Sequence, residues 1–116
     1  EHASDVVGVL DAQGVITYES PAITRLLGYA PEEMVGHEAL AFVHPDDRAA
    51  MVAELARLVA APGASARVRY RCRHREGGWR LLDAHAWNLL DLPAVQGIVI
   101  NARDVTEADL LATALR

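Results

Sequence analysis

The sequence predicts an α+β fold in which two strands, a group of helices and three further strands follow one another. Arginine stands at every second position from 67 to 75, and this period of two is typical of a β-strand whose faces differ. The turn Glu76-Gly77-Gly78 leads into a second long run, 79–90, which indicates an antiparallel hairpin. Apolar residues at helical spacing precede this hairpin, so strands and helices are segregated along the chain.

The first part of the chain predicts a hairpin followed by short helices. Residues 6–11 and 15–19 are strand-like and flank a short turn. Ser20-Pro21 then predicts a helix start, with the serine as its cap, and Gly28 marks the end of that helix. Two shorter elements follow, a one-turn helix at 31–36 and an irregular turn at 38–43.

The longest predicted helix begins at Pro45, where Asp46 and Asp47 lie in its positive first turn. One face of this helix is apolar at a spacing of three and four residues: Met51, Val52, Leu55, Leu58 and Val59. A last strand is expected at 95–103. From Thr106 the chain is helical again, with a short apolar seam formed by Ala108, Leu111 and Leu115.

Composition narrows the class of protein. The 116 residues suffice for one domain, and 52% apolar with only 5% aromatic residues predicts an aliphatic core. A single cysteine excludes an internal disulfide. The formal net charge of −5 opposes general nucleic-acid binding, because neutralising phosphates needs a basic surface. No run is long and apolar enough to cross a bilayer and no signal peptide is visible, so we expect no direct membrane insertion.

Several stretches, in this order and spacing, resemble a PAS domain. They are SPAITRLLGY at 20–29, HPDDR at 44–48, REGGW at 75–79 and GIVINARDVTE at 97–107. The resemblance covers residues 5–107 and implies a five-stranded antiparallel sheet with short helices and one long helix on one face. It also implies a sensor or dimerisation module of a longer bacterial protein, ahead of a histidine kinase, a cyclase or a phosphodiesterase. We expect 1–107 to form a single PAS domain and 108–116 to begin a linker or signalling helix.

The resemblance also supplies a register for the long hairpin. In flavin-binding relatives two ligand-contacting positions, ten apart, face inward, and they correspond to Cys72 and Leu82. Pairing these two residues leaves 76–78 as the loop, which is a common hairpin length. It also predicts two cross-strand pairs worth about 0.2–1 kcal/mol each, Arg71 with Asp83 and Arg67 with Trp87.

Small inward-facing residues predict space for a ligand between the sheet and the long helix. Ala84, Ala86 and Ala102 are small where the ligand of related domains lies, although long aliphatic side chains could fill the same space. Asn88, which this register turns inward, is the expected polar anchor. The other predicted pocket residues are Leu55, Tyr70, Cys72, Leu82 and Ile100.

The same register predicts an apolar patch on the outer face of the hairpin, formed by Trp79, Leu81, Trp87 and Leu89. Such a patch usually marks an interface. We expect a homodimer through this face or through flanking helices. The alternative is a register displaced by one residue, which would bury both tryptophans and expose the alanines.

The cofactors of related domains are disfavoured, and the sequence identifies no other. Ala39 stands where flavin-binding relatives carry their adduct-forming cysteine, and Leu82 and Ala102 replace polar flavin partners. Haem-binding relatives supply an axial histidine from the long helix, but 46–61 contains none. His44 is instead expected to cap or pack the start of that helix.

Neither a metal site nor a catalytic set is expected. The histidines are scattered without paired spacing, and Cys72 is alone on its strand, where it is interpreted as a small buried hydrophobe. Asp46-Asp47 and Glu32-Glu33 both open helices, which accounts for them without invoking chemistry. Gly77-Gly78 forms a hairpin turn, not the strand-to-helix junction of a phosphate-binding loop.

These observations predict a non-enzymatic sensory or relay domain. Ligand binding or strain in the core would shift the sheet, and Asp104, Val105 and Thr106 would pass this shift to the following helix. The rival hypothesis is a ligand-free dimerisation scaffold that works through its outer face. The expected partners are a second copy and a downstream signalling domain in the same chain. The expected location is the cytoplasm, either free or within a membrane-anchored protein.

Overall fold

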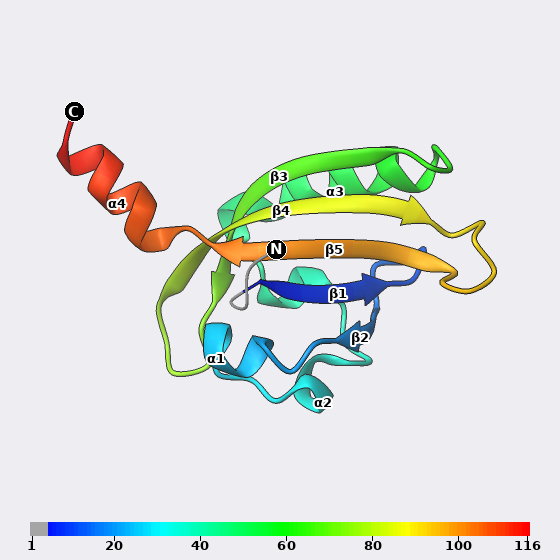
Figure 1. Ribbon diagram of the computed structural model, residues 1–116, viewed down its shortest axis with the longest axis horizontal. Coiled ribbons are helices and arrows are strands. Elements are labelled where there is room, and N and C mark those ends of the chain that lie inside the picture. The colour runs from blue at the N-terminus through cyan, green and yellow to red at the C-terminus, as the bar shows by residue number, and fades with distance from the viewer. Residues whose placement is uncertain (1–4) are drawn as a thin grey trace.

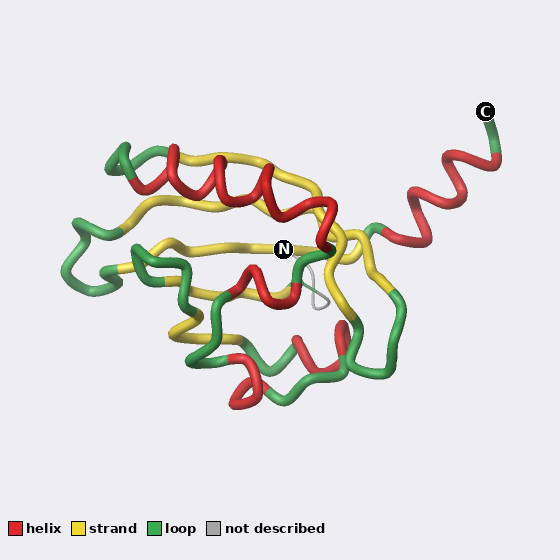
Figure 2. The backbone as a smooth tube through the Cα atoms, turned by 180° about the vertical axis from the view of Figure 1, so that it is seen from behind, coloured by secondary structure: helices red, strands yellow, loops and turns green. Residues whose placement is uncertain are grey.

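The computed structural model describes residues 5–116 and contains a five-stranded antiparallel sheet with helices against one of its faces (Figure 1). The strands are β1 (Val6–Leu10), β2 (Ile16–Glu19), β3 (Ser65–Arg73), β4 (Trp79–Leu89) and β5 (Gly97–Asp104). The helices are α1 (Ile23–Leu27), α2 (Pro31–Met34), the 3₁₀ helix η1 (Ala39–Phe42), α3 (Pro45–Val59) and α4 (Thr106–Ala114). Seen from behind, α1 to α3 lie in front of the sheet and α4 extends away from it (Figure 2). The predicted fold class is confirmed.

The strand order is β2-β1-β5-β4-β3, so the last strand in the chain joins the two hairpins in one sheet. β1 pairs with β5 from Val6 opposite Ala102 to Leu10 opposite Ile98. β2 and β3 are the two edges. This order leaves the N-terminal hairpin and the long hairpin at opposite sides of the same inner face.

The β1–β2 hairpin contains an irregularity that changes which side chains of β2 face the helices. Gly8 pairs with Glu19 and Leu10 pairs with Ile16, so β2 has one more residue between these pairs than β1 has. A bulge of this kind places two residues opposite one and re-aims the strand. Ile16 and Glu19 therefore both line the inner side of the sheet, although an odd number of positions separates them.

Two predictions about the helices are wrong and one is confirmed. Ser20 does not cap α1, because its hydroxyl oxygen accepts the N–H of Val7 at 2.9 Å and the helix begins after Ala22. Val52 does not belong to the buried face of α3: its side chain is 50% exposed, since only a narrow stripe of the helix meets the sheet. His44 does cap α3, with its Nδ1 accepting the N–H of Asp46 at 3.1 Å.

The long hairpin has a register different from the predicted one. Leu82 pairs with Tyr70 and not with Cys72. The loop is longer than expected because the chain leaves the ladder early, where the N–H of Arg75 donates to the carbonyl of Leu27 at 2.8 Å. The displacement is two positions, and an even displacement preserves the alternation of faces.

The inward and outward sets of this hairpin are therefore as predicted. The loop comprises residues 74–78, whose glycines supply the left-handed backbone of the turn. Ala84 and Ala86 are 1% and 8% exposed, whereas Trp79 is 39% exposed. These values exclude the alternative register that would bury the tryptophans.

The core lies between the sheet and the helices α1, α2, η1 and α3. Its most deeply buried large side chains are Leu27, Ile98 and Asn88. In the described part of the chain, no helix combines the length and the apolar character needed to cross a membrane.

Candidate functional site

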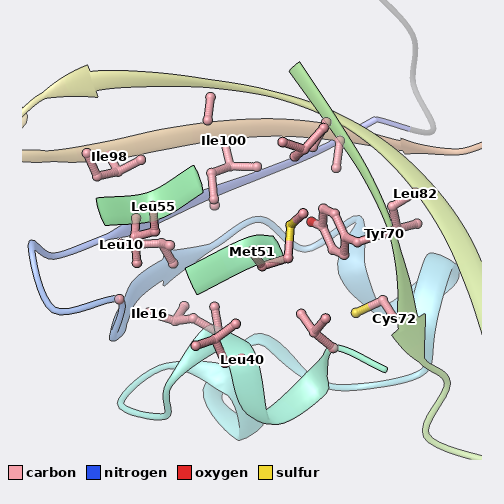
Figure 3. A pocket seen from close by; sticks show the side chains of 18 of the residues that line it. Leu10, Ile16, Leu40, Met51, Leu55, Tyr70, Cys72, Leu82, Ile98 and Ile100 are labelled. Carbon is pink, nitrogen blue, oxygen red and sulfur yellow. The ribbon is translucent and has the colours of Figure 1, made fainter. Parts of the chain in front are cut away.

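A cavity of about 160 Å³ lies between the inner face of the sheet and the helices α3 and η1 (Figure 3). Ala84, Ala86 and Ala102 leave room on the strand side, because their side chains end at Cβ. Met51 and Leu55 of α3 contribute to the facing wall. An engineered apolar cavity of about 150 Å³ holds benzene, so the space here is sufficient for a small ligand.

The structure brings almost all predicted pocket residues together around this cavity. Those that line it are Leu55, Tyr70, Cys72, Leu82, Ala84, Ala86, Ile100 and Ala102. The alternative, in which aliphatic side chains fill the space completely, is not what the structure shows. The first hairpin and the segment around η1 add lining residues that the sequence did not indicate, among them Leu10, Ile16, Glu19, Ala39 and Leu40.

Asn88 does not line the cavity, which corrects its prediction as the polar anchor. It is buried as expected, but its Nδ2 donates to the carbonyls of Leu58 at 2.9 Å and Val59 at 3.2 Å. Its Oδ1 accepts the N–H of Leu90 at 2.9 Å. The last carbonyls of a helix have no partner within the helix, so Asn88 caps the end of α3 and uses both of its N–H donors there.

Tyr70 supplies a polar group inside the cavity. Its hydroxyl group points toward Met51 across the space in Figure 3. Burial raises the pKa of Tyr70, and the nearby thiol of Cys72 and carboxyl group of Glu19 raise it further. The phenol is therefore neutral and available as both donor and acceptor.

Glu19 supplies the second polar group, from the end of β2. Its carboxyl group lies over β1, where a Cβ added to Gly8 would be 3.1 Å from the Glu19 Oε1. Burial raises the pKa of Glu19 from 4.5 to about 7, because an apolar environment disfavours the charged form. Within residues 5–116, the structure shows no hydrogen bond from another residue to this carboxyl group.

Glu19 was missed because simple alternation assigns it to the wrong face. A regular strand with Ile16 inward would point Glu19 outward, and only the bulge brings both side chains to the same side. Gly8 was the available signal. A glycine inside a strand often marks a bulge or the close approach of another group.

Cys72 is 5% exposed, and burial raises the pKa of its thiol to about 12. This confirms its interpretation as a small buried hydrophobe. Ala39, at the position of the flavin adduct in related domains, lines the cavity with a methyl group. Among residues 5–116, no group of histidine, cysteine and acidic side chains is arranged to hold a metal ion.

The outer face of the sheet carries the predicted aromatic residues. The ring of Trp87 stacks on His85, with centroids 4.0 Å apart, and the ring of Trp79 lies 4.5 Å from that of His44. Leu81 and Leu89 are partly exposed on the same strand. No helix covers this face in the part of the chain that the structure describes (Figures 1 and 2).

The arginines of β3 do not form one continuous row. Asp83 lies within 3.5 Å of Arg67 and 3.9 Å of Arg69, so the predicted pairing of Asp83 with Arg71 is wrong. Arg67 also pairs across the ladder with His85 and not with Trp87, owing to the displaced register. The remaining arginines turn to partners in the helical segment of the chain, in α3, between α1 and α2, and in α2: Arg71 to Asp47, Arg73 to Tyr29 and Arg75 to Glu33.

The junction between β5 and α4 is tied to the start of β4. The N–H of Leu81 donates to Thr106 Oγ1 at 2.8 Å, and the carbonyl of Leu81 accepts the N–H of Val105 at 2.9 Å. Arg80 donates to Asp104 at 2.7 Å and to Glu107 at 2.7 and 2.8 Å. The segment expected to transfer a signal is thus held by side-chain and backbone bonds from one neighbouring strand.

Comparison with known proteins identifies the family. The PAS fold family matches residues 16–91, and the chain belongs to this family. A domain of a sensory box sensor histidine kinase/response regulator from Geobacter sulfurreducens is 30% identical, with a TM-score of 0.71 over 90% of this chain and 86% of that one. The chain is therefore a PAS sensory domain.

More distant structures share the fold alone. The PAS domain of the RpfR quorum-sensing receptor from Cronobacter turicensis, solved in complex with BDSF, is 20% identical, with a TM-score of 0.75 over 91% of this chain and 98% of that one. A PAS domain from Colwellia psychrerythraea is 22% identical, with a TM-score of 0.77 over 90% of this chain and 89% of that one.

Fungal proteins are also similar in sequence. White collar 2 protein of Neurospora crassa is 35% identical over 83 residues, and White collar 1 protein of the same organism is 31% identical over 85 residues. These matches cover 72% and 73% of this chain but only 16% and 7% of the relatives. The similarity thus extends to fungal proteins and is not restricted to bacterial ones.

Proposed function

We propose that this domain senses a small, mainly apolar molecule in the cavity and that occupancy changes the position of α4. The cavity itself is the observation that carries this proposal. Leu82 and Ala102 line it, and Leu82 pairs with Asp104, the residue at which β5 leads into the junction. A ligand that binds one arrangement of these strands better than another would shift the junction with them.

The weak attachment of α4 supports this role. Leu110 and Leu111 are 63% and 62% exposed, so the helix buries little apolar surface against the sheet. Its charged contacts are with Arg80, through Glu107, and with Arg69, whose Nη1 lies 3.7 Å from Asp109. An element with few buried contacts changes position at low free-energy cost.

The domain is proposed to work within a longer signalling protein of the histidine kinase or cyclic-nucleotide type, in the cytoplasm or as the cytoplasmic part of a membrane-anchored protein. The similarity to a sensor histidine kinase domain supports this assignment. The leucines of α4 would then be covered by the downstream segment or by a second copy, since exposed apolar residues at this spacing favour helix pairing.

Native mass spectrometry of the purified protein, combined with hydrogen exchange of α4, tests the sensory proposal. We expect a bound mass that is lost on refolding, and faster exchange at Leu110 and Leu111 in one of the two states. Ala86→Leu, which fills the cavity, should abolish the bound mass, whereas the exposed substitution Thr17→Ala should not. Identical mass and identical exchange before and after refolding would contradict the proposal.

A second candidate function is a dimerisation scaffold that uses the outer face of β4. The observation in its favour is the uncovered patch that includes Trp79 and Trp87. Light scattering over a range of concentrations would show a dimer that Trp87→Ser weakens. Tyr18→Ser, an exposed substitution on the edge strand β2, is the matched control. A monomer at high concentration would exclude this function for the domain.

A further inference from the structure

The polar groups that line the cavity are all acidic or neutral. Besides Glu19 and Tyr70, the titratable side chains that line it are Glu38 before η1, Glu54 of α3 and Cys72 of β3. No lysine, arginine or histidine of residues 5–116 is among the lining residues. A ligand with a carboxylate would therefore meet carboxyl groups and find no cation to offset its desolvation.

Glu19 and Tyr70 come from opposite edges of the sheet, and both line the cavity. β2 and β3 are the two edge strands, and the charge of Glu19 acts on both Tyr70 and Cys72. Within residues 5–116 neither the Glu19 carboxyl group nor the Tyr70 hydroxyl group is engaged in a hydrogen bond with another residue. Both groups are thus free to bind a ligand, one as an acceptor and the other as donor or acceptor.

We propose that Glu19 and Tyr70 form the polar end of the cavity and select a small apolar ligand that carries a hydroxyl group over one that carries a carboxylate. The hydroxyl group donates to Glu19 and accepts from Tyr70, while the apolar part lies against Met51, Leu55 and the alanines of β4. This inference rests on the proposed sensory function, because it names the ligand class of the same cavity.

The charge on Glu19 makes the selection depend on pH. Glu38 is exposed and Glu54 is paired with Arg57. Glu19 is therefore the partly buried carboxyl group of the cavity that has no charged partner among the described residues. Its pKa of about 7 means that it is charged at pH 8.5 and neutral at pH 6. Discrimination against carboxylates is therefore stronger in alkaline than in mildly acidic solution.

Three probes of similar size test the proposal on the whole chain. They are 1-hexanol, its isomer pentyl methyl ether, which cannot donate a hydrogen bond, and hexanoate. Affinities are measured from the amide chemical shifts of Ala84 and Ala86 in ¹⁵N-labelled protein. At pH 8.5 we expect hexanol to bind about three- to tenfold more tightly than the ether, the ratio for one added hydrogen bond, and hexanoate to bind most weakly.

Variants assign the effect to the two residues. Glu19→Gln should raise the affinity for hexanoate about tenfold relative to hexanol at pH 8.5 and should remove the pH dependence of that ratio, because the repelling charge is gone. Tyr70→Phe should weaken hexanol and the ether alike, because the oxygen of each accepts from the Tyr70 hydroxyl group, and should leave their affinity ratio unchanged. Glu32→Gln, which removes an exposed charge of α2 that does not line the cavity, should leave all three affinities unchanged.

The outcomes separate this inference from the proposed function. If hexanoate binds as tightly as hexanol at pH 8.5, or if Glu19→Gln leaves their ratio unchanged, selection by Glu19 is wrong while ligand sensing stands. If none of the probes shifts the cavity amides, or if all shifts map to the outer face, both proposals fail.

Discussion

Two carboxyl groups of this domain, at opposite edges of the sheet, have opposite pKa shifts. Asp47, at the start of α3, accepts from Arg71 of β3 through its N–H at 2.8 Å, its Nε at 3.0 Å and its Nη2 at 2.8 Å. These hydrogen bonds lower the pKa of Asp47 to about 2. Glu19, on the other edge, has no such partner in the described chain, and burial raises its pKa to about 7. Donors at the site, more than burial, decide whether the charged form is stable.

The contrast predicts opposite pH dependences of stability. Asp47 binds fewer protons in the folded than in the unfolded state, so its contribution is present above about pH 4 and is lost as pH falls toward 2. Glu19 binds more protons in the folded state, so the free energy of unfolding falls as pH rises from about 4.5 to about 7.

The largest expected loss of stability comes from removing the paired group. Asp47→Ala leaves the N–H and the guanidinium of Arg71 without their acceptor. Because the pair is partly exposed, the variant should lower the free energy of unfolding by about 2 kcal/mol at pH 7, measured by urea denaturation. Asp46→Ala, on the exposed side of the same helix turn, should cost only about 0.5 kcal/mol. Equal losses in the two variants would show that the helix dipole, not Arg71, is the source of the stabilisation.

The unpaired group should behave in the opposite way. Glu19→Gln is expected to raise the free energy of unfolding by about 2 kcal/mol at pH 8.5 and to change it little at pH 5, because only the charged carboxylate is destabilising. Unfolding curves at several pH values check this, with Glu38→Gln as the exposed control. A stability of the wild type that is constant between pH 5 and pH 8.5 would mean that Glu19 has an ordinary pKa.

A smaller effect is expected at the junction, where Arg80 pairs with Asp104 and Glu107. Arg80→Ala should cost about 1 kcal/mol of stability because the pair is partly exposed, but it should speed hydrogen exchange throughout α4. The control is Arg103→Ala on β5, since no ion pair of Arg103 is present within residues 5–116. If exchange of α4 rises equally in both variants, Arg80 does not hold the helix.

The smallest effect is expected for Arg67, whose side chain is 67% exposed and lies 3.5 Å from Asp83. Arg67→Ala should change the free energy of unfolding by less than about 0.5 kcal/mol, and high salt should abolish even that difference. Arg71→Ala in the same strand is the comparison and should lose several times more. A large fall in the free energy of unfolding for Arg67→Ala would mean that the arginines of β3 stabilise the fold even where they are exposed.

Much of the candidate site could be predicted because side-chain alternation tolerates errors in register. The pairing of Cys72 with Leu82 was wrong by two positions, yet Ala84, Ala86 and Leu82 still face the cavity, since an even displacement changes no face. The prediction missed Glu19, because its direction depends on a displacement by one position. The bulge in β2 turned Glu19 inward, and no period of two contains that information.

Asn88 shows a different limit of prediction. Its inward direction followed from alternation, but its partners are the carbonyls of Leu58 and Val59. Where the last turn of α3 ends above the sheet depends on how the whole helix packs, which no local pattern specifies. The sequence therefore could not show whether the side-chain amide of Asn88 binds a ligand or the end of a helix.

The sequence by itself determined the α+β class, the strands and helices and the faces of the long hairpin, because these depend on local periodicity and turn residues. Only the tertiary structure decided that about 160 Å³ stays open beneath α3, that Glu19 lies inside it and that Asp47 lies beside Arg71. Those features depend on distances between segments far apart in the chain. The distance from a carboxylate to its nearest donor decides the stability of its charged form, and local sequence patterns do not specify that distance.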